Sequence, residues 1–145
     1  MVTVDRITRD DLCELAKLYE ELIGKPTDLE RMFENFEKME KSSEYILIGA
    51  KDEKGNLLGS ILGVICFDVL GECRPFMVID NVIVKNGFRG LGVGRKLINY
   101  MEAVAKTRNC YSIMLVSSFR RKEAHEFYEA VGYANDFVRG FKKYL

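Results

Sequence analysis

Apolar and polar positions at the start of the chain follow first a strand period and then a helix period. Residues 2–7 alternate apolar and polar side chains, which is typical of a β-strand with one buried face. Thr8 or Asp10 can cap a helix, and apolar residues then recur at helical spacing until Gly24. The same spacing returns over residues 29–39. We therefore predict one strand followed by two helices that cover a sheet.

The middle of the chain has the pattern of three consecutive strands. Residues 45–50 and 57–67 are strand-like, and the polar segment 52–56 between them has the composition of a hairpin turn. Residues 68–75 form a predicted loop. Residues 76–84 are almost continuously apolar, which indicates a strand in the interior of the sheet.

The second half of the chain adds two helices and two further strands to the prediction. A glycine-rich turn leads into a helix from about residue 92 to 108, followed by a buried strand over 112–116. A short helix over 123–131 ends at Gly132, and residues 137–145 supply a closing strand. No repeat or linker interrupts the sequence. The predicted fold class is therefore α/β, a mixed sheet with helices on both faces, in a single domain over residues 1–145.

Composition and charge exclude several classes of function. The 145 residues carry 22 basic and 22 acidic side chains, so the chain lacks the basic surplus of a nucleic-acid-binding domain. Four cysteines without a Cys-x-x-Cys pair and a single histidine argue against a disulfide framework or a metal site. No apolar segment approaches the roughly 20 residues that cross a bilayer, and the N-terminus lacks a secretory pattern. We expect a cytoplasmic protein that acts without metal, nucleic acid or membrane.

The segment most informative about chemistry follows the 76–84 strand. Glycines at 90, 92 and 94 form a turn that opens a helix, and such a turn leaves backbone N–H groups pointing outward at the positive end of the helix dipole. These groups can bind phosphate oxygens, and missing side chains let a pyrophosphate approach the backbone. The turn matches neither a Walker loop nor the dinucleotide-binding fingerprint. On this pattern alone, the alternative interpretation that the glycine-rich turn binds no ligand also stays open.

Two motifs in this order resemble the GNAT superfamily of acetyltransferases. Arg89-x-x-Gly92-x-Gly94 is similar to the acetyl-coenzyme A signature of that superfamily, and the segment 124–133, Ala-His-Glu-Phe-Tyr-Glu-Ala-Val-Gly-Tyr, is similar to its second hallmark. The element order matches over essentially the whole chain. The resemblance implies a mostly antiparallel mixed sheet and an enzyme that transfers an acetyl group from acetyl-CoA to a primary amine.

The resemblance also implies roles for particular residues. The backbone of the 82–84 strand end should bind the pantetheine arm, the glycine turn should hold the pyrophosphate, and cationic side chains should add charge. The implied coenzyme-binding residues are Val82, Ile83, Val84, Arg89, Gly90, Leu91, Gly92, Val93, Gly94, Arg95 and Arg121. Tyr128 matches the tyrosine that protonates the departing thiolate, and packing with Phe127 is the alternative that stays open for it.

The sequence departs from the pattern where many relatives carry a glutamate as base. Val78 stands at that position, which excludes a carboxylate base there. Asp80, two residues on, points to the same face of the strand and can act through a water or bind the acceptor ammonium. Its apolar neighbours predict that it is not fully exposed. A purely structural carboxylate remains the alternative.

A second departure lies before the second hallmark. Arg121 stands where many relatives have an asparagine, and the run 117–125 is similar to that of bacterial aminoalkylphosphonate acetyltransferases. Arg121 can neutralise a phosphate of the coenzyme or of the acceptor, or it can be a solvated cation at a helix start.

The leading hypothesis is direct acetyl transfer in a ternary complex, between the 76–84 and 112–116 strands, to a small-molecule amine. The alternatives are an acetyl-CoA-binding regulatory or sensor module without turnover, and a protein or peptide acetyltransferase. Acceptor contacts implied by the resemblance come from the first two helices and from the loops around 24–30 and 68–75. Aminoalkylphosphonates, polyamines, amino sugars and peptide amines all stay candidates, and a homodimer is kept open.

Overall fold

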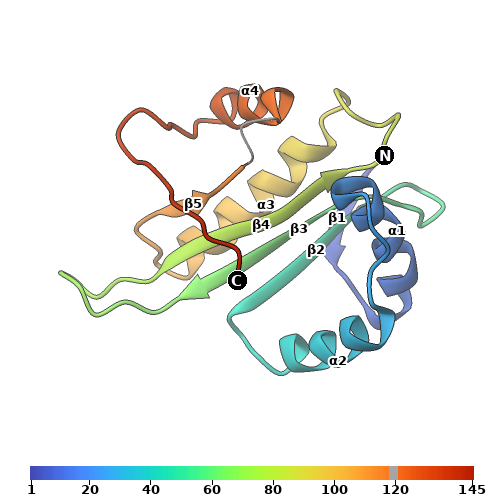
Figure 1. Cartoon of the computed structure of the whole chain (residues 1–145), viewed down its shortest axis with the longest axis horizontal. Coiled ribbons are helices and arrows are strands. Elements are labelled where there is room, and N and C mark those ends of the chain that lie inside the picture. The colour runs from blue at the N-terminus through green and yellow to red at the C-terminus, as the bar shows by residue number, and fades with distance from the viewer. Residues whose placement is uncertain (118–120) are drawn as a thin grey trace. The chain divides into compact units, whose positions relative to one another are not determined.

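The structure, a computed structural model, describes residues 1–117 and 121–145 (Figure 1). It divides into two compact units, Met1–Met114 and Leu115–Leu145, and each is described by itself. The elements in chain order are β1 (Thr3–Arg6), the 3-10 turn η1 (Arg9–Asp11), α1 (Leu12–Ile23), α2 (Leu29–Glu40), β2 (Tyr45–Lys51), β3 (Leu57–Cys66), β4 (Phe76–Val84), α3 (Val93–Thr107), β5 (Ile113–Leu115) and α4 (Lys122–Ala130). No helix within the described residues is long and apolar enough to cross a membrane. The order agrees with the prediction as far as α4.

The sheet has the order β1-β2-β3-β4-β5 and is mixed. The first four strands are antiparallel neighbours. The approach to β5 runs parallel to the start of β4, because the Tyr111 N–H donates to the Pro75 carbonyl (2.9 Å) and the Met77 N–H donates to the Ser112 carbonyl (3.0 Å). The predicted mixed, mostly antiparallel α/β fold is therefore confirmed.

Helices cover both faces of this sheet in the first unit, as predicted (Figure 1). On one face α1 and α2 form a buried cluster with the sheet, whose members are Ile7, Leu12, Leu15, Leu18, Phe36, Leu57 and Ile83. On the other face α3 buries Leu97, Ile98 and Met101 against the central strands. Burial of these apolar side chains is the main source of stability for both layers.

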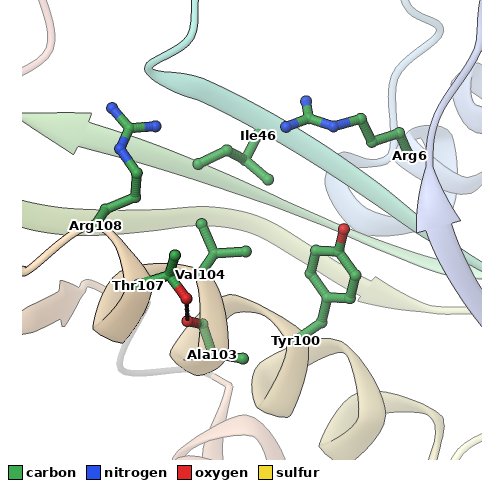
Figure 2. Close-up of a pocket in the computed structure, with 7 residues that line it drawn as sticks. All are labelled: Arg6, Ile46, Tyr100, Ala103, Val104, Thr107 and Arg108. Atoms are coloured by element: carbon green, nitrogen blue, oxygen red, sulfur yellow. Dashed lines mark hydrogen bonds between the residues drawn. The ribbon is translucent and has the colours of Figure 1, made fainter.

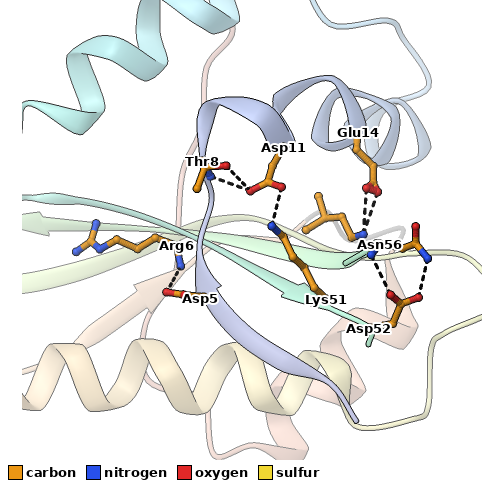
Figure 3. A network of polar contacts seen from close by, with 9 residues as sticks. Asp5, Arg6, Thr8, Asp11, Glu14, Lys51, Asp52 and Asn56 are labelled. Atoms are coloured by element: carbon orange, nitrogen blue, oxygen red, sulfur yellow. Dashed lines mark hydrogen bonds and ion pairs between the residues drawn. The ribbon is translucent and has the colours of Figure 1, made fainter. Parts of the chain in front are cut away.

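A network of polar contacts fixes the start of α1 to the hairpin between β2 and β3 (Figure 3). Thr8, and not Asp10, caps the first turn: its N–H donates to the Asp11 carboxylate (2.8 Å), which also accepts from Lys51 Nζ (2.6 Å). Burial works to raise the pKa of Asp11, but the contacts with Lys51 and Thr8 outweigh it and hold that pKa below its usual range. One turn later the Glu14 carboxylate accepts from the Leu57 N–H (2.9 and 3.1 Å).

Gly59 on β3 sets how closely the first turn of α3 approaches the sheet. A Cβ at this position would lie 2.8 Å from the carbonyl oxygen of Ile83 on β4 and 3.2 and 3.3 Å from Val93 and Leu97 on α3. No side chain larger than hydrogen fits that space without movement. The glycine therefore lets the N-terminus of α3 pack against the ends of β3 and β4.

Two strand predictions in the last third of the chain need correction. The strand predicted as buried over 112–116 is the three-residue β5, in which Met114 is exposed, because β5 lies at the edge of the sheet. Residues 137–145 form no strand and are exposed throughout. Gly140 and the adjacent Lys142 and Lys143 interrupt the alternation of apolar and polar side chains that a half-buried strand requires.

The close packing at Gly59 predicts a difference between two glycine-to-alanine variants on the same strand. Gly59→Ala places its methyl group against a backbone carbonyl, whereas Gly63→Ala meets only the flexible side-chain ends of Met101 and Met77. We expect Gly59→Ala to lower the free energy of unfolding by about 1–3 kcal/mol in urea denaturation, and Gly63→Ala to lower it less. Equal or larger destabilisation by Gly63→Ala would contradict the packing argument.

Candidate active site

The turn between β4 and α3 has the backbone conformation that its glycines predict. Gly87, Gly90 and Gly92 have φ values of 88°, 77° and 85°, a region that disfavours residues with a Cβ. Gly92 is the N-cap of α3, and no side chain caps it. The first intrahelical hydrogen bond runs from Lys96 N–H to the Gly92 carbonyl (3.1 Å).

The N–H groups of Val93, Gly94 and Arg95 precede that bond, so they have no partner in the helix ladder. The first turn also carries no acidic side chain that would occupy the positive end of the helix dipole. These features together are those of an anion site.

The space in front of this turn is open. A Cβ on Gly90 or Gly92 would meet no protein atom within 4 Å, so an anion can approach the backbone there. Gly94, by contrast, is buried in the first turn of α3, and its missing side chain serves packing instead of ligand approach. The Val93 side chain is buried as well, which leaves only its backbone to a ligand.

Two arginines lie beside the turn, as predicted. Arg89 and Arg95 are both exposed, and Arg89 Nε donates to the Val84 carbonyl at the end of β4 (3.2 Å). The exposed Leu91 side chain lies between them in the sequence. The turn thus combines outward N–H groups, positive charge and open space, and its residues fit a pyrophosphate.

Among the described residues, no strand pairs with the outer backbone edge at the end of β4, next to this turn. Ile83 and Val84 pair with Ser60 and Gly59 of β3 on one side. On the other side β5 has only three residues, and its pairing begins at the start of β4, so it is too short to run beside residues 82–84. This arrangement supports the predicted pantetheine contacts of Val82, Ile83 and Val84, which remain a prediction.

A β-bulge interrupts β4 directly before that edge. Asn81 has a φ of 51°, and the register with β3 shifts between Ser60 and Leu62. Asn tolerates this conformation better than most residues, and bulges re-aim side chains near active sites. The Asp80 carboxylate accepts from the Asn81 N–H (2.9 Å), and Asp80 lies on the exposed surface of the strand. The strand pattern in the sequence did not reveal this bulge.

Tyr19 is a candidate site residue that the sequence pattern missed. It lies on α1, packs against the buried cluster and places its hydroxyl near Ser60, Asp80 and Asn81. Burial raises the pKa of Tyr19 to about 12; contacts with Ser60 and Asn81 oppose the shift, and the charge of Asp80 adds to it. In the sequence Tyr19 is one apolar-face residue among several. The only indication in the sequence of a polar cluster at this place was the pair of polar residues 80–81 within an apolar strand.

The remaining predicted residues belong to the second unit. Tyr128 on α4 is buried, and its ring lies 5.5 Å from that of Phe127 and 6.5 Å from that of Tyr133. Arg121 is the exposed N-cap of α4, and its carbonyl accepts from the His125 N–H (3.1 Å). Part of the predicted 117–125 motif, residues 118–120, lies outside the described residues. The catalytic role of Tyr128 and the phosphate contact of Arg121 remain predictions.

A hollow of about 300 Å³ lies elsewhere in the first unit (Figure 2). It is formed by β1, β2 and the C-terminal half of α3, and its lining consists of Arg6, Ile46, Tyr100, Ala103, Val104, Thr107 and Arg108. Twelve residues separate Val104 from Gly92, so the hollow lies about 18 Å along α3 from the glycine turn. Its lining includes two arginines and two hydroxyl side chains but no carboxylate. It is therefore separate from the predicted coenzyme site.

Comparison with known proteins agrees with this geometry. The sequence pattern of the Acetyltransferase (GNAT) family matches residues 9–133. The chain is 30% identical over 128 residues to Glucosamine 6-phosphate N-acetyltransferase 1 of Dictyostelium discoideum, which covers 82% of this chain and 78% of the relative.

Two solved structures share the fold. Glucosamine-6-phosphate N-acetyltransferase from Arabidopsis thaliana matches with a TM-score of 0.86 and 21% identity over 99% of both chains. AAC(6′)-Iy in complex with the bisubstrate analog CoA-S-monomethyl-acetylneamine matches with a TM-score of 0.82 and 17% identity, over 100% of this chain and 99% of the other.

A β4 strand that leads through an uncapped glycine turn into α3, together with the match over residues 9–133, defines the class of protein. The chain belongs to the GNAT acetyltransferase family. Within it, the chain is an acetyl-CoA-dependent N-acetyltransferase. Among the residues that the structure describes, no three His, Cys, Asp or Glu side chains gather to hold a metal ion.

The open turn predicts that Gly92 matters for coenzyme binding beyond its effect on stability. In Gly92→Val the branched side chain would fill the space in front of the N–H groups, and we expect acetyl-CoA affinity to fall roughly 10- to 100-fold in calorimetric titration. The control is Gly71→Val, at a φ of 61° and with equally open surroundings, in the loop before β4. Both variants should lose stability, but only the first should lose affinity. Equal affinity in the two folded variants would contradict the assignment.

Proposed function

We propose that this protein transfers the acetyl group of acetyl-CoA to the primary amine of a small, anionic molecule, by direct transfer in a ternary complex. An amino sugar phosphate is the first acceptor to test. The observation that carries this choice is the 30% identity, over most of both chains, to a relative named as a glucosamine 6-phosphate N-acetyltransferase. Aminoalkylphosphonates share the same chemistry, a primary amine with an anionic group.

The proposed reaction forms one bond and breaks one. The neutral amine attacks the carbonyl carbon of the thioester, the C–N bond forms, and the C–S bond breaks. The nitrogen loses a proton, and the departing sulfur gains one. Since amines are mostly protonated at neutral pH, the site must accept a proton before the attack and supply one after it.

The first unit supplies binding and polarisation in this proposal. Backbone N–H groups from Gly90 to Arg95 hold the pyrophosphate, and the edge of residues 82–84 aligns the pantetheine arm and directs an N–H toward the thioester carbonyl oxygen. Such an N–H stabilises negative charge that develops on that oxygen. Holding both reactants together supplies a further share of the rate.

Asp80 is the proposed partner of the acceptor amine. Its exposure and its place beside the bulge give it access both to solvent and to the sheet face next to the coenzyme edge. It binds the ammonium group and passes its proton to water. Val78, two residues earlier on β4, has no proton-accepting group, so Asp80 is the carboxylate that β4 offers on this face.

Tyr128 is the proposed acid, and its loss should affect turnover more than binding. Tyr128→Phe removes only the hydroxyl, so kcat should fall roughly 10²- to 10⁴-fold in a steady-state assay while the KM for each substrate changes little. Tyr133→Phe, which keeps a ring that packs against Tyr128, is the matched control. Near wild-type turnover of Tyr128→Phe would make Tyr128 a packing residue only.

Arg121 is the proposed contact for the anionic group. If it binds the acceptor, Arg121→Ala should raise the KM for glucosamine 6-phosphate and 2-aminoethylphosphonate roughly 10-fold or more, but not the KM for spermidine. If it binds coenzyme phosphate, the KM for acetyl-CoA should rise with every acceptor. Lys122→Ala, the neighbouring cation, controls for a general loss of charge. A wild-type preference for spermidine over both anionic amines would rule out an anionic acceptor.

The second candidate function is acetyl-CoA binding without turnover, as in a sensor module. It is favoured by Val78, where many relatives have a glutamate. A panel of glucosamine 6-phosphate, 2-aminoethylphosphonate, spermidine and a lysine peptide separates the two functions by release of free thiol. Acetyl-CoA binding without thiol release above the hydrolysis background for any amine would favour the sensor.

A further inference from the structure

Helix α1 carries two glutamates on one face, and each accepts a hydrogen bond from a backbone N–H of another segment. Glu14 accepts from the Leu57 N–H at the start of β3 (2.9 and 3.1 Å; Figure 3). Glu21 accepts from the Asn86 N–H (2.9 Å), two residues after the end of β4. Seven residues are close to two helical turns, so the two carboxylates lie on the same side of α1. The helix is therefore joined to the sheet by one glutamate and to the β4–α3 turn by the other.

Few other hydrogen bonds hold the β4–α3 turn. The Phe88 N–H donates to the Lys85 carbonyl (3.0 Å) within the turn, and Arg89 Nε donates to the end of β4 (3.2 Å). Both of these bonds are local in the sequence. Among the hydrogen bonds of the described residues, the bond from Glu21 is the one that joins residues 86–92 to an element other than β4 and α3.

The residue that Glu21 holds comes directly before the first glycine of the turn. Gly87 has a φ of 88°, and glycine loses more conformational entropy than any other residue when its backbone is fixed. An anion that binds the N–H groups of the turn needs them in one arrangement, and any ordering that occurs during binding lowers the affinity. A hydrogen bond at residue 86 orders part of the turn before the ligand arrives.

We propose that Glu21 is a positioning residue for the coenzyme site. Its carboxylate fixes the start of the turn, and the N–H groups at the start of α3 are thereby kept in the arrangement that binds a pyrophosphate. Its charge has the opposite effect, because a negative side chain that contacts the turn repels an anion bound there. Loss of the charge alone would therefore raise coenzyme affinity, whereas loss of the hydrogen bond lowers it. The inference rests on the proposed binding of acetyl-CoA by the turn.

Two variants of Glu21 separate the hydrogen bond from the charge. Glu21→Ala removes both, whereas Glu21→Gln removes the charge and keeps a side-chain oxygen that can accept the Asn86 N–H. In calorimetric titration with acetyl-CoA, Glu21→Ala should bind roughly 3- to 10-fold more weakly than the native protein, the range expected for one hydrogen bond. Glu21→Gln should bind at least as tightly as the native protein.

The matched control is Glu20→Ala. Glu20 is the neighbouring exposed glutamate, and its side chain makes no hydrogen bond or ion pair within the part of the chain that the structure describes. This variant removes the same charge from the same helix, so it should not weaken acetyl-CoA binding. In steady-state kinetics with the best acceptor of the panel above, Glu21→Ala should raise the KM for acetyl-CoA and leave kcat near the native value, because the reacting groups are unchanged.

The calorimetric result does not depend on which amine is acetylated. Unchanged or tighter acetyl-CoA binding by folded Glu21→Ala would overturn the inference, and so would a loss of affinity in Glu21→Gln as large as that in Glu21→Ala. A native protein that does not bind acetyl-CoA would contradict the proposed function and the inference with it, so the two failures are distinguishable.

Discussion

The uncapped N-terminus of α3 is the feature on which the other parts of the site depend. Three backbone N–H groups and the positive end of a 15-residue helix point out of the fold where the glycine turn leaves open space. That end of the helix is held against the sheet because Gly59 leaves room between β3, β4 and α3. Anion binding at this turn thus depends on packing in the core as well as on the glycine motif itself. The motif can present its N–H groups here because Gly59, more than 30 residues earlier, lets α3 pack closely against the sheet.

The bulge at Asn81 gives β4 two different functions along one strand. Before the bulge, the strand packs on both faces and carries Asp80 toward α1. After it, Ile83 and Val84 pair with β3, and no strand of the described residues pairs with their other edge. An acceptor amine bound at Asp80, as proposed above, would therefore lie next to a thioester aligned along that edge. Backbone strain at a non-glycine residue with positive φ is common at functional sites, and at Asn81 it accompanies the bulge that divides β4 into these two parts.

Much of the fold could be predicted from the sequence, because the spacing of apolar residues and the helix-capping residues indicate the same elements along most of the chain. The bounds of β4 and the start of α3 were predicted closely, since a continuous apolar run and three glycines leave few alternatives. The bulge was not predicted, because strand periodicity does not reveal one extra residue. Tyr19 could not be recognised as a candidate either, because it lies 41 residues from Ser60 in the sequence and only the tertiary structure brings the two side chains near each other. The prediction of a closing strand over residues 137–145 was wrong, and the alternation of apolar and polar residues is weak in that segment.

Binding of the coenzyme by the backbone of the β4–α3 turn can be followed residue by residue through the amide chemical shifts of the ¹⁵N-labelled protein during titration with coenzyme A. We expect the largest shifts at Gly90 to Arg95, whose N–H groups would contact phosphate oxygens, with further shifts at residues 82–84. Amides of the C-terminal half of α3, around Val104, should change little. Shifts concentrated at the hollow beside Arg6 and Arg108, with the glycine turn unchanged, would contradict it.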